Sequence, residues 1–536
     1  MKLYRRKSSA EAIIFSLPER KPDSRGLEKC RSRYLKVTSH HPNEKSTGFC
    51  LWIADAWVGK PRLNTNRLKS STMVLLSLIP DGVGVRNFLL SSFLQDASEK
   101  GQVSVLHSIP ENLLATYNSK LNGKIKWRRF LPYQDDPFSF TLRNTLSYAH
   151  MCWADTQAMR HLRNLPVKGT WQRRSAVHVA KLAGRAAASV RGIRMLDRWH
   201  YSTVERSPAV QYYRQLLGES KPSVLFCSHQ RPLAVLPPVL AAKSLGIPTA
   251  TFIFSWDNLT SKGRIVAPFD HYLVWSAHMR DELLRYYPSI SVEQVHVVGT
   301  PQFDSYADER LLWSREEFFR RIKADLSRPL ICYSGGDVGN YPEEHQQVRA
   351  LMELIRAGRI DRNPQVLLRP SPVDEGRRYD SVRRDYPELI YAPPFWVHSD
   401  SSDWAAILPS AEDVQFLANL THHADLNINL ASTMTLDFAI HDKPVVNVAF
   451  DTTEPLPFSV PLWDYYYQFE HYRPVVKLGA ARFARSPEEL ADHVNAYLKN
   501  PSLDAHNRRQ LVELEVSLPL GRSSQRIVEV LEAIAR

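Results

Sequence analysis

The sequence predicts an α/β protein with two consecutive doubly wound domains. From residue 73 onward, short apolar runs alternate with helical segments, which is the pattern of parallel strands joined by helices. The 536 residues exceed the size of one ordinary hydrophobic core. A glycine- and proline-containing break at residues 299–301 divides the alternation into two series. Two consecutive domains are therefore expected.

The predicted strands are short apolar stretches bounded by turn residues. Those of the first series are residues 74–79, 103–107, 223–227, 249–254, 272–275 and 295–298. Those of the second series are residues 330–334, 366–369, 389–391, 426–430, 445–450 and 475–478. We expect a first domain at residues 72–305, a linker helix at 306–328 and a second domain at 329–536.

Most of the positive charge lies in the first part of the chain. Residues 1–70 hold 16 Lys and Arg against 6 Asp and Glu, which leaves only +3 of the net charge of +13 for the remaining residues. Residues 1–71 also lack helical or strand periodicity, which predicts a disordered, dispensable tail. The alternative is a basic tail that contacts anionic lipid or polymer. Nucleic acid is not an expected partner, because no recognition motif appears.

The cysteines and the apolar runs indicate the compartment. Five cysteines are scattered singly without a CxxC spacing, which argues for a reducing compartment and against a disulfide framework or a zinc site. The longest apolar runs, at residues 73–79 and 235–242, are too short to span a bilayer. The apolar stretch near the N-terminus is too short for a signal peptide. We therefore expect a cytoplasmic protein.

Residues 138–219 depart from the alternation and are predicted to form a helical, basic insertion in the first domain. Within them, residues 159–198 hold ten Lys and Arg, and only Asp197 opposes them. Apolar residues with helical spacing predict the face that packs, namely Val179, Leu182, Ala183, Ala186, Val190 and Ile193. The basic face is either solvated, or it rests on a membrane or an acidic, lipid-linked acceptor.

Residues 425–450 predict a phosphate site in the second domain. A strand runs into Ser432 and Thr433 at the start of a helix, where backbone N–H groups and the helix dipole favour an anion. Asp437 follows one turn later and is placed to reach a ribose hydroxyl. The alternative is that Ser432 or Thr433 only caps the helix and Asp437 is solvated.

A glycine-rich turn follows the first predicted strand of each domain. The residues concerned are Asp81, Gly82, Gly84 and Arg86 in the first domain, and Ser334, Gly335 and Gly336 in the second. Glycines let a backbone approach a ligand closely, and ligands of open parallel sheets bind beyond the carboxyl ends of the strands. Neither turn is a Walker loop or a full GxGxxG motif. Each is a weak signal alone, but two such turns at one cleft predict a binding site.

Arg369 ends another predicted strand, and Pro370, Ser371 and Pro372 form a rigid turn behind it. Its planar guanidinium suits a phosphate, because it can donate two parallel hydrogen bonds and stays charged. The alternative is a structural salt bridge.

A dense group of polar residues in the first domain follows the strand at 249–254. Asp257 is the first candidate for a general base there, and Trp256, Asn258 and Lys262 are candidates for binding substrate. The alternative is an Asx-turn closed by Asp257 or Asn258. Two rival bases follow other strands of the same domain, namely His229 and Asp81.

These motifs together resemble the GT-B superfamily of nucleotide-sugar glycosyltransferases, whose relatives include UDP-N-acetylglucosamine 2-epimerases and CDP-glycerol glycerophosphotransferases. The resemblance covers residues 72–536. It depends on VGTPQFD at 298–304, SGG at 334–336, LRPSP at 368–372, STMTLD at 432–437 and KPVV at 443–446. The block SWDNLTSKG at 255–263 is similar to one in bacterial surface-polysaccharide proteins of this type.

The resemblance implies two Rossmann-like domains that face a cleft. The second domain would hold most of the nucleotide, and its last helix, near residues 523–535, would return to the first domain. Ser432 and Thr433 would meet the diphosphate, Asp437 the ribose, and the turn at 334–336 the phosphates or the transferred group. Arg369 would neutralise the charge on the leaving nucleotide. The acceptor and the base would belong to the first domain.

Two further implications concern metals and substrates. Such enzymes need no metal, and Asp400 and Asp403 do not form a convincing DxD motif. Glycerophosphotransferase-like relatives tend to have His where this chain has Ser371. That departure argues against polyol-phosphate transfer.

The sequence thus predicts a bacterial, metal-independent glycosyltransferase without a cofactor. It would move a sugar from a nucleotide-sugar donor to a cell-surface glycan or a lipid-linked acceptor, in the cytoplasm or at the inner face of the membrane. The alternatives are a sugar-nucleotide epimerase, a CDP-glycerol-type polyol-phosphate transferase, and a non-catalytic polysaccharide-assembly protein.

Overall fold

The computed structural model describes residues 72–536 apart from 119–124, 168, 340, 399–406 and 453–459. Residues Leu68–Arg536 form one compact unit. The predicted tail at 1–71 and the pair Asp400 and Asp403 lie outside the described residues. No helix of the described residues is long and apolar enough to cross a bilayer.

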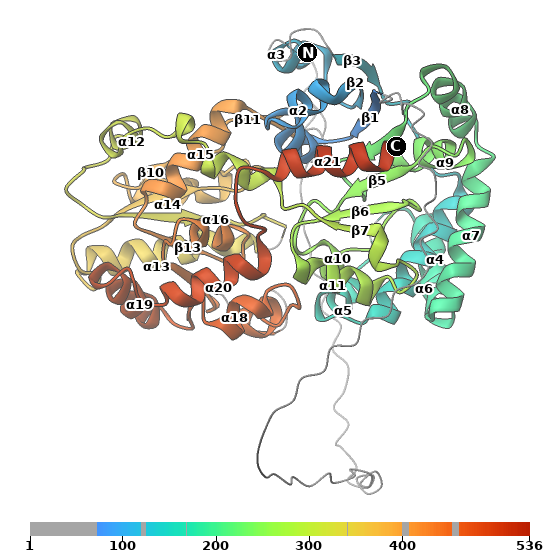
Figure 1. The fold of residues 1–536 in the computed structure, drawn as a ribbon. Coiled ribbons are helices and arrows are strands. Elements are labelled where there is room, and N and C mark those ends of the chain that lie inside the picture. The colour runs from blue at the N-terminus through green and yellow to red at the C-terminus, as the bar shows by residue number, and fades with distance from the viewer. Residues whose placement is uncertain (1–71, 119–124, 168, 340, 399–406, 453–459) are drawn as a thin grey trace, which may run out of the picture. The chain divides into compact units, whose positions relative to one another are not determined.

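The first sheet has seven parallel strands in the order β3-β2-β1-β4-β5-β6-β7 (Figure 1). They are β1 Met73–Ile79, β2 Gly101–His107, β3 Ile125–Arg129, β4 Val224–Cys227, β5 Thr249–Phe252, β6 His271–Val274 and β7 Val295–Val297. Every residue of β4 and β5 is buried, because helices cover both faces of a parallel sheet. The order reverses between β1 and β4, which makes that crevice the switch point of a doubly wound sheet.

The second sheet has six parallel strands in the order β10-β9-β8-β13-β14-β15. They are β8 Leu330–Ser334, β9 Gln365–Arg369, β10 Ile390–Tyr391, β13 Leu426–Asn429, β14 Val445–Val448 and β15 Arg482–Ala484. Its switch point lies between β8 and β13. Two doubly wound parallel sheets confirm the predicted α/β fold class.

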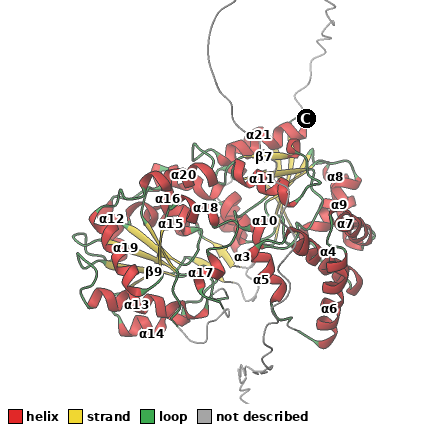
Figure 2. Cartoon of the chain, turned by 90° about the horizontal axis from the view of Figure 1, so that it is seen from below, coloured by secondary structure: helices red, strands yellow, loops and turns green. Residues whose placement is uncertain are grey.

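Helices flank both sheets, as Figure 2 shows. Those of the first are α1 Gly82–Gly84, α2 Phe93–Lys100, α3 Glu111–Asn118, α9 Leu236–Ser244, α10 Asn258–Ser261 and α11 Ala277–Tyr286. Those of the second include α13 His345–Arg356, α14 Asp380–Asp385, α15 Ala411–His423, α16 Met434–Ile440, α17 Leu462–Tyr466, α19 Pro487–Lys499 and α20 Ala505–Glu515.

The insertion between β3 and β4 consists of five helices. They are α4 Pro137–Ala154, α5 Gln157–Asn164, α6 Trp171–Ala186, α7 Val190–Glu205 and α8 Pro208–Ser220. Each begins with a side-chain N-cap, provided in turn by Asp136, Thr156, Thr170, Ser189 and Ser207. Such caps satisfy N–H groups that lack a partner within the helix, and they mark where each of the five helices begins.

The packing face predicted for this insertion is wrong for α6. Val179 and Leu182 are 59% and 72% exposed, whereas Ala180 and Gly184 are buried against α4. A Cβ on Gly184 would lie 2.7 Å from the carbonyl oxygen of Thr145. The close approach of the two helices therefore selects the small-residue face of α6 and leaves the large apolar side chains outside.

Three other differences between the prediction and the structure lie beyond residue 300. Residues 475–478 belong to helix α18 Arg473–Leu478 and not to a strand, and the last strand is β15. The linker at 306–328 is not one helix, because only α12 Arg315–Ile322 is α-helical there, after the 3₁₀ turns that begin with η5 Pro301–Ala307. The third is an unpredicted antiparallel pair of β11 Trp396–His398 and β12 Ile407–Pro409.

The chain returns from the second sheet to the first through its last helix, α21 Ser523–Ala535, drawn in red in Figure 1. This helix packs against α2, β1 and β4. Asp304, in η5, accepts hydrogen bonds from the backbone N–H groups of Ser523 (3.1 Å) and Ser524 (3.0 Å). The segment that leaves the first sheet thus caps the helix that comes back to it.

Candidate active site

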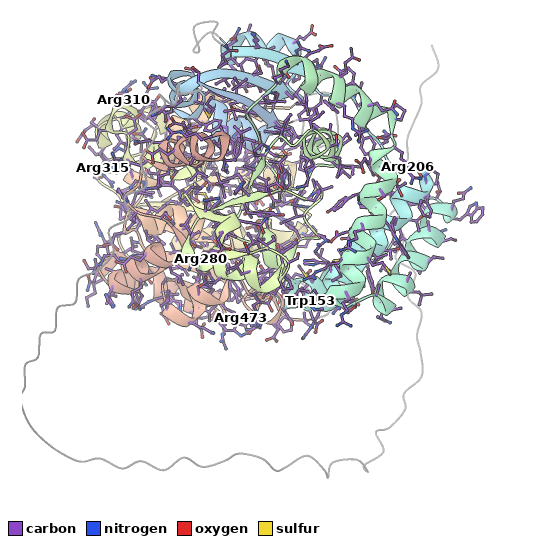
Figure 3. All side chains as sticks on the ribbon, turned by 45° about the vertical axis from the view of Figure 1, so that its right-hand side comes forward. Trp153, Arg206, Arg280, Arg310, Arg315 and Arg473 are labelled. Atoms are coloured by element: carbon purple, nitrogen blue, oxygen red, sulfur yellow. The ribbon has the colours of Figure 1, made fainter. Side chains whose placement is uncertain are left out.

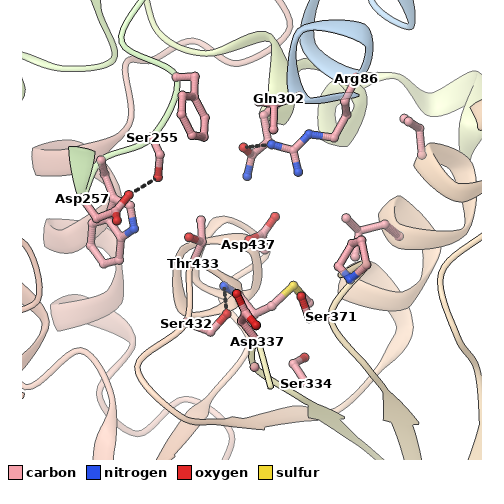
Figure 4. Close-up of a pocket in the computed structure, with 18 of the residues that line it drawn as sticks. Arg86, Ser255, Asp257, Gln302, Ser334, Asp337, Ser371, Ser432, Thr433 and Asp437 are labelled. Carbon is pink, nitrogen blue, oxygen red and sulfur yellow. Dashed lines mark hydrogen bonds between the residues drawn. The ribbon is translucent and has the colours of Figure 1, made fainter. Parts of the chain in front are cut away.

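A cavity of about 970 Å³ lies between the two sheets and takes residues from both. Twelve of the seventeen predicted site residues line it, so most of the sequence hypothesis concerns one place. They are Arg86, Trp256, Asp257, Lys262, Ser334, Gly335, Gly336, Arg369, Ser371, Ser432, Thr433 and Asp437. The five that do not line it are Asp81, Gly82, Gly84, His229 and Asn258. Figure 4 shows the cavity with residues of both sheets around it.

Buried asparagines hold the switch point of the second sheet open. Asn427 donates to the Ser334 hydroxyl (2.8 Å), and Asn429 donates to Asn427 (2.7 Å) and accepts from the backbone N–H of Ser432 (3.0 Å). The network joins the end of β8 to the turn before α16. Ala431, in that turn, has a φ of 45°, a left-handed conformation that non-glycine residues rarely adopt and that recurs at functional sites.

Glu344 fixes the neighbouring glycine turn. Its buried carboxylate accepts from the backbone N–H of Gly336 (2.8 Å) and pairs with Arg378 (3.0 Å). Burial raises the pKa of Glu344, although the Arg378 charge opposes the rise. Gly335 is required for packing, because a Cβ there would lie 2.4 Å from the Tyr379 hydroxyl. The turn therefore has a fixed shape where it meets the cavity.

The sequence allowed two interpretations of Arg369, a phosphate contact and a structural salt bridge, and its surroundings are consistent with both. One terminal nitrogen, Nη2, donates to both oxygens of Asp413 at 2.8 and 3.0 Å, so a structural ion pair is present. The side chain is 6% exposed and lines the cavity, and Nη1 has no hydrogen-bond partner among the described residues. Nη1 exposes almost no surface of its own. Because a buried guanidinium N–H without a partner is costly, Nη1 would gain from an anion that reached it from the cavity.

The carboxylate of Asp437 is hydrogen-bonded to the segment that connects the two sheets. Its carboxylate, 2% exposed, accepts a hydrogen bond from the Tyr306 hydroxyl. Burial raises the pKa of Asp437 to about 6, against the lowering effects of Tyr306 and of the Arg86 charge. Arg86 in turn donates to the Gln302 side chain (2.6 Å), as Figure 4 shows. Asp437 lines the cavity, but one of its oxygens is already engaged.

The switch point of the first sheet is filled, which corrects the roles predicted for Asp81, His229, Gly82 and Gly84. Asp81 accepts from the backbone N–H of Gly84 (3.0 Å) and from His229, and both side chains are at most 2% exposed. A Cβ on Gly82 would lie 1.9 Å from the carbonyl oxygen of Ile407 in β12. Gly82 packs against the second half, the other three residues pack within the first half, and none of the four lines the cavity.

Asp257 reaches the cavity but is a poor base. It accepts from Ser261 (2.7 Å) and Asn258 (3.0 Å), and Lys262 lies 3.5 Å away. Burial raises the pKa of Asp257, but the charges of Lys262 and His471 and the serine hydrogen bonds outweigh it and hold the pKa well below its usual range. Asn258 is buried and also accepts from Gln230 (2.8 Å), so it supports the loop instead of binding substrate.

His471 is the base candidate that the sequence prediction missed. It lines the cavity, and its Nδ1 lies 3.0 Å from the Thr260 hydroxyl. Burial lowers its pKa to about 4, so the imidazole is neutral at pH 7. Thr260 can donate to the carbonyl oxygen of Asp257 (3.3 Å) and accept from Nδ1–H, which leaves Nε2 able to take a proton.

Metal ligands do not gather in this cavity. No three His, Cys, Asp or Glu side chains of the described chain are arranged to hold an ion.

Comparison with known proteins finds similar solved structures and nothing by sequence. No family model and no curated protein matches the chain. A UDP-N-acetylglucosamine 2-epimerase is 12% identical, with a TM-score of 0.48, over 86% of this chain and 95% of that one. A glycosyltransferase from Rickettsia africae is 12% identical with a TM-score of 0.47, over 87% and 99% of the two chains.

The wall teichoic acid polymerase TagF, in a crystal soaked with CDPG, is 9% identical with a TM-score of 0.44, over 87% of this chain and 90% of that one. Likenesses this distant do not decide an activity.

Proposed function

We propose that the protein is a glycosyltransferase that uses a nucleotide sugar as donor. The observation that supports this most is the open switch point of the second sheet, where Ser432, Arg369 and the turn at 334–336 border one cavity. A diphosphate there would accept hydrogen bonds from the N–H groups before α16 and from Nη1 of Arg369. The ion pair with Asp413 would hold the guanidinium in place for that contact.

Charge is the main demand of such a reaction, because the leaving nucleotide gains negative charge as its bond to the sugar breaks. Arg369 and the helix start would stabilise that charge from the second sheet. The base would be His471 rather than Asp257, because the low pKa of Asp257 makes its carboxylate a weak acceptor.

The proposed step forms one bond and breaks one bond. Nε2 of His471 takes the proton of an acceptor hydroxyl, and the oxygen attacks the anomeric carbon of the donor sugar. The bond from that carbon to the diphosphate breaks, and its electron pair stays on the diphosphate oxygen. The acceptor would be a hydroxyl of a glycan or a lipid-linked glycan, held near Trp256 on the side of the first sheet.

Nucleotide binding tests the proposal. The midpoint of thermal unfolding of the full chain should rise saturably with one of UDP, CDP, GDP or their sugar derivatives, because a ligand of the native state stabilises it. Arg369→Lys keeps a positive charge beside Asp413 but removes the second terminal nitrogen, and it should weaken nucleotide binding at least tenfold. Arg320→Ala, a 71% exposed arginine outside the cavity, should bind as the wild type does.

The other outcomes identify the alternatives. No shift with any nucleotide would favour a polysaccharide-assembly protein that only retains the fold. Conversion of a nucleotide sugar to its epimer without an acceptor would identify an epimerase. Transfer of a polyol phosphate from CDP-glycerol would identify the third alternative.

A further inference from the structure

Large apolar side chains of the insertion remain outside the core. Of the seventeen exposed large hydrophobic residues in the described chain, nine fall within 137–220. They are Phe138, Leu162, Leu165, Trp171, Val179, Leu182, Met195, Trp199 and Tyr212. Singly exposed apolar residues are ordinary, but a concentration on one insertion indicates a binding surface.

The exposed side of α6 carries the largest of them. Trp171, Val179 and Leu182 are 67%, 59% and 72% exposed and share one side of the helix, opposite Ala180 and Gly184. Because the small face packs on α4, no described element covers the large apolar face.

Helix α7 has the same organisation. It buries Ile193, Leu196, His200 and Val204, while Met195 and Trp199 are 43% and 56% exposed on the other side. Both helices pack against α4. In Figure 3 the two helices lie near the labelled Trp153 and Arg206. We refer to Trp171, Val179, Leu182, Met195, Trp199 and the arginines between them as the α6–α7 surface.

The charge on this surface has one sign. Its exposed arginines make no ion pair with any described residue, and they are Arg174, Arg185, Arg191, Arg194 and Arg198. The one acidic residue in this stretch, Asp197, is bound to Arg264 (2.9 Å) and so does not offset them. Tryptophan and leucine beside unpaired arginines are the composition of helices that lie in the plane of a membrane interface.

We propose that the α6–α7 surface docks on an anionic lipid bilayer. The apolar side chains would enter the headgroup region while the arginines contact lipid phosphates. Like charge argues against two other occupants. The N-terminal tail has a surplus of ten positive charges, and a second copy in a symmetric contact would place the same arginines against each other.

The insertion also reaches the cavity, because His161 and Leu162 of α5 line it. Docking there would bring a lipid-linked acceptor to the same part of the molecule. The surface lies outside the cavity, however, so the docking proposal stands whether or not the protein is a transferase.

Vesicle sedimentation tests the proposal with the full chain in every arm, so that the basic tail is the same throughout. The wild type should bind vesicles of phosphatidylcholine and phosphatidylglycerol in equal parts and not those of phosphatidylcholine alone. Leu182→Glu with Trp199→Glu should reduce that affinity at least tenfold. The matched control, Val292→Glu with Leu326→Glu, changes residues that are 51% and 46% exposed elsewhere and should bind as the wild type does.

A second variant guards against misfolding. Arg191→Gln, Arg194→Gln and Arg198→Gln together should also lose at least tenfold in affinity, with an unchanged midpoint of thermal unfolding. Failure of the wild type to bind the anionic vesicles would overturn the proposal. So would wild-type affinity in both surface variants, because the tail or another surface would then carry the binding.

Discussion

Asp257 and His471 come from different halves and influence each other's charge at the cavity, and the histidine is the stronger base of the two. Hydroxyl and amide donors and Lys262 surround the carboxylate, so its pKa is low. The imidazole is neutral because it is buried. Sequence patterns reveal which side chains are polar but not how many donors each has already satisfied, and this is why the prediction ranked Asp257 first.

Substitution of His471 separates proton transfer from nucleotide binding. His471→Gln should lower kcat by about 10²–10⁴-fold, because general-base catalysis contributes that much, while the nucleotide-induced shift in unfolding midpoint stays. Since the pKa of His471 is about 4, the loss of kcat/KM that protonation of this residue causes should appear only below about pH 5.

Two comparisons make the assignment of the base testable. Thr260→Ser keeps the hydroxyl beside Nδ1 and should retain activity. Asp257→Asn should cost less than His471→Gln. If the aspartate variant were the inactive one, Asp257 would be the base after all.

At the scale of elements, helix α6 shows why apolar spacing alone did not find the packed face. Val179 and Leu182 have the right periodicity, but α4 approaches so closely that only Ala180 and Gly184 fit between the two helices. The small residues on one side of α6 indicate the packed face. They can be recognised in the sequence when large and small apolar residues are treated separately.

The same substitution in two helices should have opposite effects on stability. Gly184→Ala places a Cβ 2.7 Å from a backbone oxygen of α4 and should lower the free energy of unfolding by about 1–3 kcal/mol. Gly218→Ala, in α8, meets nothing within 4 Å and should raise it by about 0.5–1 kcal/mol. Denaturant unfolding of both variants measures the difference. Equal effects would mean that the α4–α6 contact is looser than described.

The strands themselves were largely predictable, since eleven of the twelve predicted runs coincide with observed strands. The exception, residues 475–478, is a short apolar run whose type periodicity cannot decide. Pro474 at the start and Gly479 with a φ of 61° after the end mark it as a helix. Strand β3 was missed because three of its five residues are charged, which leaves this edge strand only a weak apolar signal.

At the scale of the whole molecule, the residues that sequence reasoning misplaced are those that contact distant segments. Gly82 looked like a ligand-binding glycine, but it makes room for β12, more than three hundred residues later in the chain. Ser432 and Arg369 were placed at the cavity because parallel strands align their carboxyl ends by topology alone. No local pattern distinguishes a switch point that is filled from one that is open.

Asp437 and Tyr306 link the second sheet to the segment between the sheets, and their contact should make stability depend on pH. Because the folded pKa of Asp437 is about 6 and its ordinary value is 3.8, the folded state binds more protons in that window. Its contribution to stability is complete below pH 3.8 and is lost as pH rises to about 6, by about 3 kcal/mol.

Asp437→Asn removes this dependence and keeps an oxygen for the Tyr306 hydroxyl. The unfolding midpoint of the variant relative to that of the wild type should therefore rise between pH 4 and pH 6. Measuring the difference between the two proteins cancels the other groups that titrate in this window. A constant difference across the window would show that Asp437 titrates normally.

The contact of Asp304 with Ser523 and Ser524 has a mechanical consequence. The two chain segments that connect the halves are hydrogen-bonded to each other at this point, so we expect a relative movement of the halves to be a rotation about it. A swing preserves the spacing of Arg369 and Ser432, which ride on the same half, and changes only their separation from Trp256. The contacts to the nucleotide would then be fixed before the movement, while the distance to the acceptor would change with it.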